Sequence, residues 1–430
     1  MRVLEVGCGR GDLLAALSPS LGVGVDFSAV MLKQASEKHP SLQFIHADAQ
    51  DLDLTGPFDV VVLSDLVNDL WDVQVVLEKL ANVVGPETRL ILNTYSRVWQ
   101  LPVSAAQRLG LSRPTLAQNW LTVEDIANLL QLTGFAVVKQ SREILLPVKI
   151  PVVTRMLNRI VAKLWPFSML ALTNFVVARR PAKEAHETRE RAPRVSVIVP
   201  ARNEAGNIEG IMTRTPEMGS GTELIFVEGH SQDDTYQAIE EAIARHPERR
   251  TRLLRQTGRG KGDAVRLGFS QATGDVLMIL DADLTVLPEH LPRFLEAVVT
   301  GRGEFVNGVR LIYPMEGQAM RFFNLVGNKF FSLAFTWLLG QSVKDTLCGT
   351  KVMRKADYDR IAANRGYFGD FDPFGDFDLL FGANRLSLKI VDLPVRYHQR
   401  TYGSTNIQRW RHGWLLLRMV AFAAMRIKFV

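Results

Sequence analysis

The sequence has very little cysteine and no long apolar stretch that is free of charge. Cys8 and Cys348 are its two cysteines, and their wide separation in a chain of 430 residues gives no reason to infer a disulfide framework. The two most apolar stretches, residues 322–339 and 414–430, both contain basic residues, whereas a spanning helix needs about 20 nearly uncharged residues. We therefore expect neither a disulfide-stapled fold nor a transmembrane helix.

The sequence also lacks a secretory signal and a strong charge excess. Glu5 and Asp12 interrupt the region where a signal peptide would be apolar. Lys and Arg number 51 against 45 Asp and Glu, and the resulting net charge of +6 suits phosphorylated ligands or an anionic lipid surface without indicating nucleic acid. We expect a cytoplasmic protein, peripheral on the cytoplasmic membrane face, and the sequence gives no indication of its oligomeric state.

Length and hydropathy patterning predict more than one domain. At roughly 100–200 residues per domain, a chain of this length holds two or three. Short β-branched runs alternate with helix-like stretches over residues 1–181 and again over 195–405, which predicts two α/β domains with open, largely parallel sheets. Residues 182–194 are highly charged and have no apolar side chain larger than alanine, so they predict a linker. Residues 406–430 predict an amphipathic C-terminal helix.

Glycines and carboxylates follow the first three predicted strands. Asp26 ends the second strand and Asp48 ends the third, where they can reach a ribose and an adenine edge. Glycines after the first strand permit a tight turn and admit a ligand against bare backbone. The three strand ends predict a nucleoside site, and the alternative is a generic dinucleotide fold with solvated acidic loops. The run after the first strand, EVGCGRG, contains Glu5, Gly7, Gly9 and Gly11.

At these positions the sequence resembles the class I S-adenosylmethionine-dependent methyltransferases. LEVGCGRGDLL, GVDFS, HADAQDL and FDVVVLSDLVNDLWD match that family's successive motifs in order over roughly residues 1–181. The resemblance implies a Rossmann-like sheet that binds S-adenosylmethionine at the glycine loop, with Asp26 at the ribose and Asp48 by the adenine. It also implies that Asp65 lies beside the reacting centre. The methyl acceptor stays open.

Polar residues also follow the predicted strands of the second domain. Glycines with cationic side chains, as in GRGKGD, suit a diphosphate. A wholly apolar strand then ends in Asp281-Ala282-Asp283, and alternate residues of an extended chain share one side, so both carboxylates can address one divalent cation. The alternative for such a pair is a helix or turn cap. The residues of these loops that we expect to bind a donor are Pro200, Ala201, Asn203, Glu204, Glu228, Asp233, Arg259, Lys261 and Asp281.

These motifs resemble the inverting, family-two glycosyltransferases with the GT-A fold, over about residues 195–405, and in particular the dolichol-phosphate mannosyltransferase type. The resemblance implies that Asp281 and Asp283 bind Mg²⁺ or Mn²⁺ and the nucleotide, with Asp283 counted as catalytic. It further implies that the GKG loop contacts the donor and that Arg400 belongs to a basic loop that covers the donor phosphates. Glu228 stands where many members have aspartate.

An aspartate cluster, FGDFDPFGDFD, can supply a general base. Asp376 is the expected catalytic base for a hydroxyl acceptor, whereas a polyprenyl phosphate is already anionic and needs none. The alternative is that several of these aspartates cap a helix that begins near Gly375. The aromatic, basic stretches 321–339 and 409–429 suit a membrane interface, and otherwise pack on the sheet or on a second subunit.

The predicted function is a bifunctional transferase. One domain transfers a sugar, with a divalent cation, from a nucleotide sugar to a lipid-linked or glycan acceptor, and the other methylates with S-adenosylmethionine. The competing hypothesis is a glycosyltransferase whose first domain is a non-catalytic binding or docking module. It arises because the methyltransferase family usually has a helical segment ahead of the first strand, whereas here the first strand starts at residue 3. No nucleic-acid partner is expected.

Overall fold

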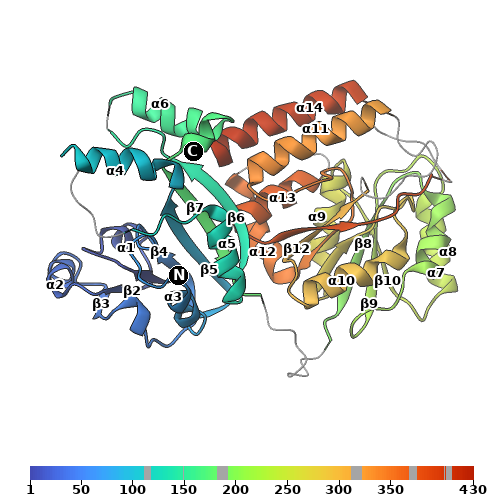
Figure 1. Cartoon of the computed structure of the whole chain (residues 1–430). Helices are drawn as coiled ribbons and strands as arrows, with labels where there is room; N and C mark the ends of the chain where they lie inside the picture. Colours follow the sequence, from blue (N-terminus) through green and yellow to red (C-terminus); the bar gives the residue numbers. More distant parts are fainter. Residues whose placement is uncertain are drawn as a thin grey trace. The chain divides into compact units, whose positions relative to one another are not determined.

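The computed structural model describes residues 1–110, 118–148, 150–181, 192–310, 322–367, 375–400, 402 and 409–430. The chain divides into two compact units (Figure 1). Unit 1 comprises residues 1–182 with 429–430, and unit 2 comprises residues 183–428. Most of the predicted linker lies outside the described residues. Within the described residues each unit has a seven-stranded, mainly parallel sheet, which confirms the predicted α/β fold class.

The sheet of unit 1 has the order β3-β2-β1-β4-β5-β7-β6, and only β7 runs antiparallel to its neighbours. Since β1 pairs with β2 on one side and β4 on the other, the direction of winding reverses there and opens a crevice at the strand ends. The strands are β1 (Arg2–Val6), β2 (Leu21–Asp26), β3 (Gln43–His46), β4 (Phe58–Leu63), β5 (Val84–Tyr95), β6 (Ala136–Glu143) and β7 (Thr173–Arg179).

In unit 1, α3 and α5 bury apolar faces set by the helical period, whereas α4 and α6 have no buried residues. In α3, one face is buried against the sheet, and the side chain of Asp72 begins the helix by accepting from the Val75 amide at 3.1 Å. The helices are α1 (Asp12–Ala16), α2 (Ala29–Lys38), α3 (Val73–Leu80), α4 (Gln100–Arg108), α5 (Val123–Leu132) and α6 (Val153–Arg159), with the 3₁₀ turns η1 (Ala49–Asp51), η2 (Arg97–Trp99), η3 (Val161–Lys163) and η4 (Phe167–Leu170).

The sheet of unit 2 has the order β10-β9-β8-β11-β13-β12-β14, with β13 antiparallel to both neighbours. The central strands β8, β9 and β11 are buried on both faces, which explains their continuous apolar runs. The last three strands of the unit were not predicted from the sequence. The strands are β8 (Val195–Ala201), β9 (Thr222–Glu228), β10 (Arg250–Arg255), β11 (Val276–Ile279), β12 (Phe305–Val309), β13 (Lys351–Arg354) and β14 (Ile390–Pro394).

Helices of unit 2 carry several of the polar residues singled out above at or near their first turns. A helix that begins at Asp376, directly after Gly375, was the alternative expected for that aspartate. The helices are α7 (Ile208–Arg214), α8 (Thr235–Arg245), α9 (Lys261–Gln271), α10 (Leu291–Val299), α11 (Phe322–Leu339), α12 (Lys355–Ala363), α13 (Asp376–Arg385) and α14 (Arg409–Ala423), with η5 (Ala205–Asn207), η6 (Pro288–His290), η7 (Arg365–Tyr367) and the π-helical η8 (Ala424–Lys428).

The aromatic helices α11 and α14 pack on each other, as their parallel course in Figure 1 shows. The Phe335 ring of α11 stacks on the Phe381 ring of α13 with centroids 5.5 Å apart, so one face of α11 is part of the core. Other apolar residues of the two helices remain exposed, among them Leu333 and Trp414. No helix within the described residues is both long enough and apolar enough to cross a membrane.

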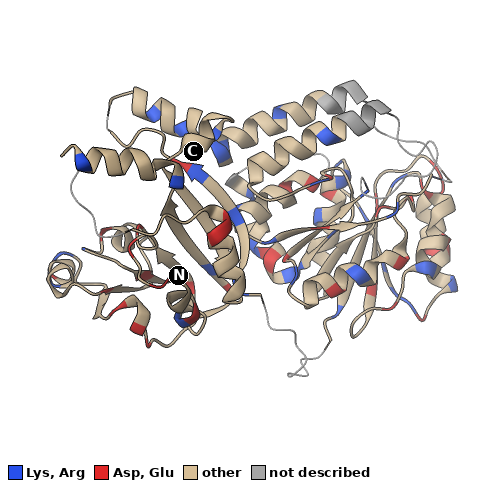
Figure 2. Ribbon diagram, viewed as in Figure 1, with Lys and Arg blue, Asp and Glu red and all other residues tan. Residues whose placement is uncertain are grey.

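Unit 1 also exposes apolar side chains, around α6 and the turns η3 and η4. Figure 2 shows basic but no acidic residues along α6, and the basic residues of this helix are both arginines. The sequence motifs gave no indication of this surface.

Candidate active sites

The glycine loop of unit 1 has the backbone conformation that its glycines predict. Gly7, Gly9 and Gly11 have φ of 75°, 51° and 71°, in the left-handed region that favours glycine. An added Cβ at Gly9 would meet no atom within 4 Å, so the loop presents open backbone there. At Gly11 an added Cβ would lie 2.7 Å from the Phe44 ring, so that glycine serves packing. The bare, open backbone at Gly9 fits a nucleoside ligand.

Two carboxylates hold this loop in place. Asp26 accepts from the backbone amides of Gly9 at 2.8 Å and Ser28 at 2.9 Å. Glu5 is 3% exposed and accepts from the Leu14 amide at 3.1 Å, beneath the first turn of α1. Burial raises the pKa of Glu5 to about 7. Glu5 thus braces the helix that follows the loop from a buried position. Asp26 lies at the end of β2, where its carboxylate has lone pairs left to accept from a ribose.

The other two predicted residues of this site lie after β3 and β4. Asp48 is exposed and caps η1 through the Gln50 amide at 2.9 Å. Asp65 has a φ of 53° and exchanges hydrogen bonds with Asn93, whose Oδ1 accepts from the Asp65 amide at 2.8 Å and whose Nδ2 donates to Asp65 Oδ1 at 2.6 Å. Asn93 therefore orients Asp65. The sequence pattern missed Asn93 because a polar residue inside a strand has no motif around it.

A cavity of about 550 Å³ opens in unit 1 on the side of the β4 and β5 ends. Asn119, which lines the cavity, is tied to the segment after β4 by two hydrogen bonds. Its backbone N–H donates to Asn68 O at 2.7 Å, and its Nδ2 donates to Leu70 O at 2.5 Å. The lining is mostly polar and consists of Arg97, Gln100, Gln118, Asn119, Trp120, Leu121, Asp125, Asn128 and Leu129.

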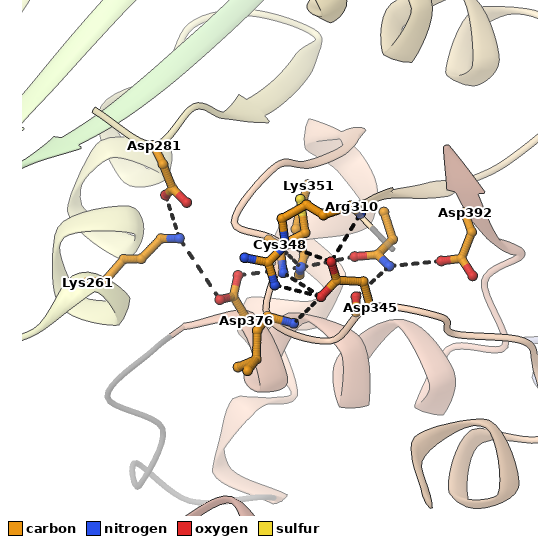
Figure 3. A network of polar contacts seen from close by, with 10 residues as sticks. Lys261, Asp281, Arg310, Asp345, Cys348, Lys351, Asp376 and Asp392 are labelled. Carbon is orange, nitrogen blue, oxygen red and sulfur yellow. Dashed lines mark hydrogen bonds and ion pairs between the residues drawn. The ribbon is translucent and has the colours of Figure 1, made fainter. Parts of the chain in front are cut away.

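In unit 2 the two carboxylates of the D-x-D sequence each lie against a cation of the chain. Asp281 Oδ1 is 2.6 Å from Lys261 Nζ (Figure 3). Asp283 Oδ2 accepts from Arg400 at 2.7 Å, and Arg400 also donates to Glu204 Oε1 at 3.1 Å. β11 ends at Ile279, so these aspartates lie in a turn and not on the predicted extended strand. The two carboxylates are nonetheless held at one strand end.

Burial and charge shift the pKa values of these groups in opposite directions. Burial raises the pKa of Glu204 to about 7, although the Arg400 guanidinium opposes the rise. For Asp281, burial acts to raise the pKa, but the Lys261 ammonium more than offsets it and the pKa is lowered. For Lys261, burial acts to lower the pKa, but Asp281 and then Asp376 raise it above its ordinary value.

Asp376 stands between two ammonium groups. Its Oδ2 is 3.9 Å from Lys261 Nζ and its Oδ1 is 3.5 Å from Lys351 Nζ (Figure 3). Asp376 is 4% exposed, and among the described residues its Oδ1 has no hydrogen-bond partner. The first turns of α9 and α13 approach each other closely. An added Cβ at Gly375 would lie only 2.6 Å from Gly262 Cα, so glycine is needed there. The sequence therefore brings Lys261 and Asp376 together through glycine.

The loop between α11 and β13 braces the fold through Asp345. Asp345 is fully buried and accepts from Arg310 at 2.7 and 2.8 Å, as well as from the amides of Leu347 and Cys348. Its pKa is lowered, because Arg310 more than offsets the effect of burial. The fully buried Lys351 donates to Asn307 Oδ1 at 3.0 Å and to Cys348 O at 2.5 Å. Sequence reasoning missed Lys351, Asn307 and Arg310, since nothing in a sequence separates a buried cation from an exposed one.

The remaining predicted donor residues form a second loop network. Asn203, with a φ of 58°, accepts from the Gln232 amide at 2.7 Å, which ties the loop after Pro200 and Ala201 to the loop after β9. The second loop contains Asp233, which accepts from Tyr402 at 3.3 Å. It follows Glu228, the last residue of β9, which is 4% exposed and accepts from the Ser231 amide at 2.5 Å.

Arg259 is exposed and has no described contact with the Lys261–Asp281–Asp376 group. Tyr402 was not predicted. Asp370 and Asp372 lie outside the described residues.

Comparison with known proteins follows the same division. Residues 196–361 match the family Glycosyl transferase family 2, and residues 3–87 match a methyltransferase domain family. The chain therefore joins a methyltransferase domain to a glycosyl transferase family 2 domain, as predicted from its motifs.

Two curated relatives match about half of this chain. The "Dolichol-phosphate mannosyltransferase" of Pyrococcus furiosus is 28% identical over 223 residues, which is 50% of this chain and 59% of the relative. The "Undecaprenyl-phosphate 4-deoxy-4-formamido-L-arabinose transferase" of Klebsiella pneumoniae is 26% identical over 216 residues, 49% of this chain and 62% of the relative. The chain thus spans about three-fifths of the length of these relatives. A solved S-adenosylmethionine-dependent methyltransferase from Mesorhizobium loti is 19% identical, with a TM-score of 0.34, and covers 42% of this chain and 90% of its own.

Glu5→Gln should change how stability depends on pH. Folding raises the pKa of Glu5 from about 4.5 to about 7, so the protonated side chain stabilises the folded protein below pH 4.5. This contribution, about 3 kcal/mol, is lost as the pH rises through the folded-state pKa. Wild type should therefore lose about that much relative to Glu5→Gln between about pH 4 and pH 8, measured by urea unfolding of the full chain. The exposed Glu37→Gln is the matched control. Parallel pH profiles for wild type and Glu5→Gln would contradict the burial argument.

Gly349→Ala should separate Lys261 from Asp281 without unfolding the protein. The added methyl group would overlap the Asp281 carboxylate and the Lys261 ammonium, both of which end flexible side chains that can move away. We expect at least tenfold weaker binding of Mn²⁺ with a nucleoside diphosphate, followed by electron paramagnetic resonance, and a thermal midpoint near wild type. Gly366→Ala, where an added Cβ meets no atom within 4 Å, is the control. Equal binding by both variants would show that this pair does not shape the site.

Proposed function

We propose that unit 2 is a cation-dependent, inverting glycosyltransferase that moves a sugar from a nucleotide sugar to a polyprenyl phosphate. The observation that carries this proposal is the gathering of Asp281, Asp283 and Asp376 with Lys261 and Arg400 at the end of β11. The names of the two curated relatives, which contain dolichol phosphate and undecaprenyl phosphate, support the lipid phosphate as acceptor.

The aspartates fit a divalent cation because each already accepts a cationic group of the chain. Within the described residues no cluster of three or more His, Cys, Asp or Glu could hold a metal ion, so Asp281 and Asp283 would share it with donor oxygens. A divalent cation bound there neutralises charge on the diphosphate leaving group. Lys261 and Arg400 are then placed to turn from the carboxylates toward the donor phosphates, which would hold the donor in position.

The acceptor decides what Asp376 does. A phosphate monoester attacks the anomeric carbon without losing a proton first, whereas a hydroxyl group needs a base. In the first case Asp376 holds the ammonium groups of Lys261 and Lys351 in place, and in the second its Oδ1, which lies 3.5 Å from Lys351 Nζ, takes the proton.

We propose that unit 1 binds S-adenosylmethionine along the glycine loop and methylates an acceptor in the cavity beyond β4 and β5. When bound, the cofactor supplies a methyl group on a sulfonium. Asp26 would receive the ribose hydroxyls, and Asp48 the adenine edge. Asp65 follows β4, which lies between β1 with its glycine loop and β5, and Asn93 of β5 holds Asp65 in place. The main requirement at this position is to hold the acceptor in line with the methyl group.

The membrane part of the proposal concerns α14. Trp414 and Leu417 are exposed and lie between Arg411 and Arg418 in the sequence, which suits peripheral contact with an anionic surface. Leu416 is buried, so it belongs to the packing of the helix and not to such a surface.

Asp376→Asn should distinguish the two acceptor classes. The assay is mass spectrometry of products formed from a panel of nucleotide sugars with a polyprenyl phosphate or with soluble glycans. With the lipid phosphate, Asp376→Asn should keep activity within about tenfold of wild type, whereas with a hydroxyl acceptor it should lose about 10²–10⁴-fold. Asp378→Asn, on the same helix but paired with Arg365, is the matched control. No sugar transfer to either acceptor by wild type would refute the proposal.

Unit 1 should bind S-adenosylhomocysteine in the full chain, measured by calorimetry. Gly9→Val should abolish binding, because its side chain would enter the open space over the loop, and Asp26→Ala should weaken it. Gly134→Val is the control, since Gly134 also has a positive φ and open space but lies in the turn before β6. Binding without methyl transfer to any acceptor would favour the docking module, and no binding at all would overturn the cofactor assignment.

A further inference from the structure

A continuous segment of unit 1, from the end of β6 to the start of β7, exposes large apolar side chains. Val152 and Trp165 are each 80% exposed, and Leu170 is 53% exposed. We call this set the α6–η4 surface. Its members used below are Ile150, Val152, Met156, Leu164, Trp165 and Leu170, all among the exposed large hydrophobic residues of the chain.

The α6–η4 surface is built and not frayed. Asn158 Oδ1 accepts from the amides of Leu145 and Leu146, each at 2.9 Å, and its Nδ2 returns a hydrogen bond to Leu146 O at 2.9 Å. The Ile150 amide donates to Thr154 Oγ1 at 2.9 Å. Lys163 pairs with Glu143 at the base of the segment, and Ala162 is fully buried. These hydrogen bonds fix the backbone of the segment, so its apolar side chains stay exposed in the folded protein.

Basic side chains predominate on this surface, and Glu143, an acidic residue at its hollow, is paired with Lys163. The sequence contains no Asp or Glu from residue 144 to residue 183, whereas Arg155 and Arg159 are exposed on α6 (Figure 2). A hollow of about 560 Å³ opens there, and its lining includes Ile150, Val152 and Arg155. Exposed apolar side chains with cations among them and tryptophan at the edge match the chemistry of a lipid interface, where phosphates pair with the cations.

We propose that the α6–η4 surface docks unit 1 on an anionic lipid surface, independently of α14. The occupant is a bilayer rather than a protein because the complementary partner must offer both an apolar layer for Trp165 and Leu170 and a dense anionic layer for Arg155. A membrane-docked unit 1 would take its methyl acceptor from molecules held at that interface. The docking itself does not depend on methyl or sugar transfer.

The test uses the full chain with Trp414→Ser and Leu417→Ser as the parent, so that α14 contributes little. Flotation is measured with phosphatidylcholine vesicles with and without phosphatidylglycerol. The parent should still float with the anionic vesicles, and Trp165→Ser with Leu170→Ser should weaken its partition about tenfold or more. Arg155→Gln should weaken partition on anionic vesicles and leave neutral vesicles unaffected.

Trp71→Ser in the same parent is the matched control, because Trp71 is 92% exposed in unit 1 but lies beside Asp72 and outside the α6–η4 surface. It should float like the parent, and all variants should keep the parent's thermal midpoint and S-adenosylhomocysteine affinity. A parent that no longer floats, or equal flotation by Trp71→Ser and the double variant, would overturn the proposal. So would a double variant that changes a dimer into a monomer in sedimentation while vesicle binding stays the same, since a second copy would then cover this surface.

Discussion

The repulsion among Asp281, Asp283 and Asp376 is the constraint around which unit 2 is arranged. Carboxylates gathered at one strand end in a partly buried site destabilise one another unless cations lie among them. The chain supplies those cations at fixed positions: Lys261 lies between Asp281 and Asp376, Lys351 lies behind Asp376, and Arg400 joins Asp283 to Glu204. Cations of the chain therefore compensate the carboxylates of the site, and a bound cation and diphosphate would exchange partners with groups already present.

The internal charges differ in how freely they can exchange. Lys351 is fully buried and donates to Asn307 and to the Cys348 carbonyl oxygen, so moving it would break both hydrogen bonds and leave Asp376 with Lys261 alone in a low-dielectric interior. Lys261 ends a side chain at the first turn of α9, next to glycine on both sides in sequence, and it can turn away when a better anion arrives. The fold thus combines one fixed cation with cations that can move.

Local sequence predicted the parts of these sites that depend on strand ends and glycine. The alternating pattern located both sheets, and EVGCGRG indicated the loop whose glycines adopt positive φ. The partners of the site residues could not be read in the same way. Asn93 orients Asp65 from the next strand, and Lys351 reaches Asp376 from a strand that the hydropathy pattern did not reveal. The extended geometry expected for Asp281 and Asp283 was wrong because β11 ends at Ile279, and Asp345 became a bracing residue only once Arg310 was placed beside it.

Composition alone does not reveal which apolar side chains are exposed, for a related reason. Long aromatic stretches such as α11 draw attention by composition, yet Phe335 stacks on Phe381 inside the core, and only part of that helix is exposed. The segment around α6 has a less conspicuous composition, but it is held by hydrogen bonds of its own side chains and exposes several large apolar side chains. Burial depends on what packs against a residue, so a short segment pinned by Asn158 can present more apolar surface than a longer helix that lies on a core. Surfaces that meet a lipid interface are therefore better sought in the pattern of exposure and charge sign than in hydropathy alone.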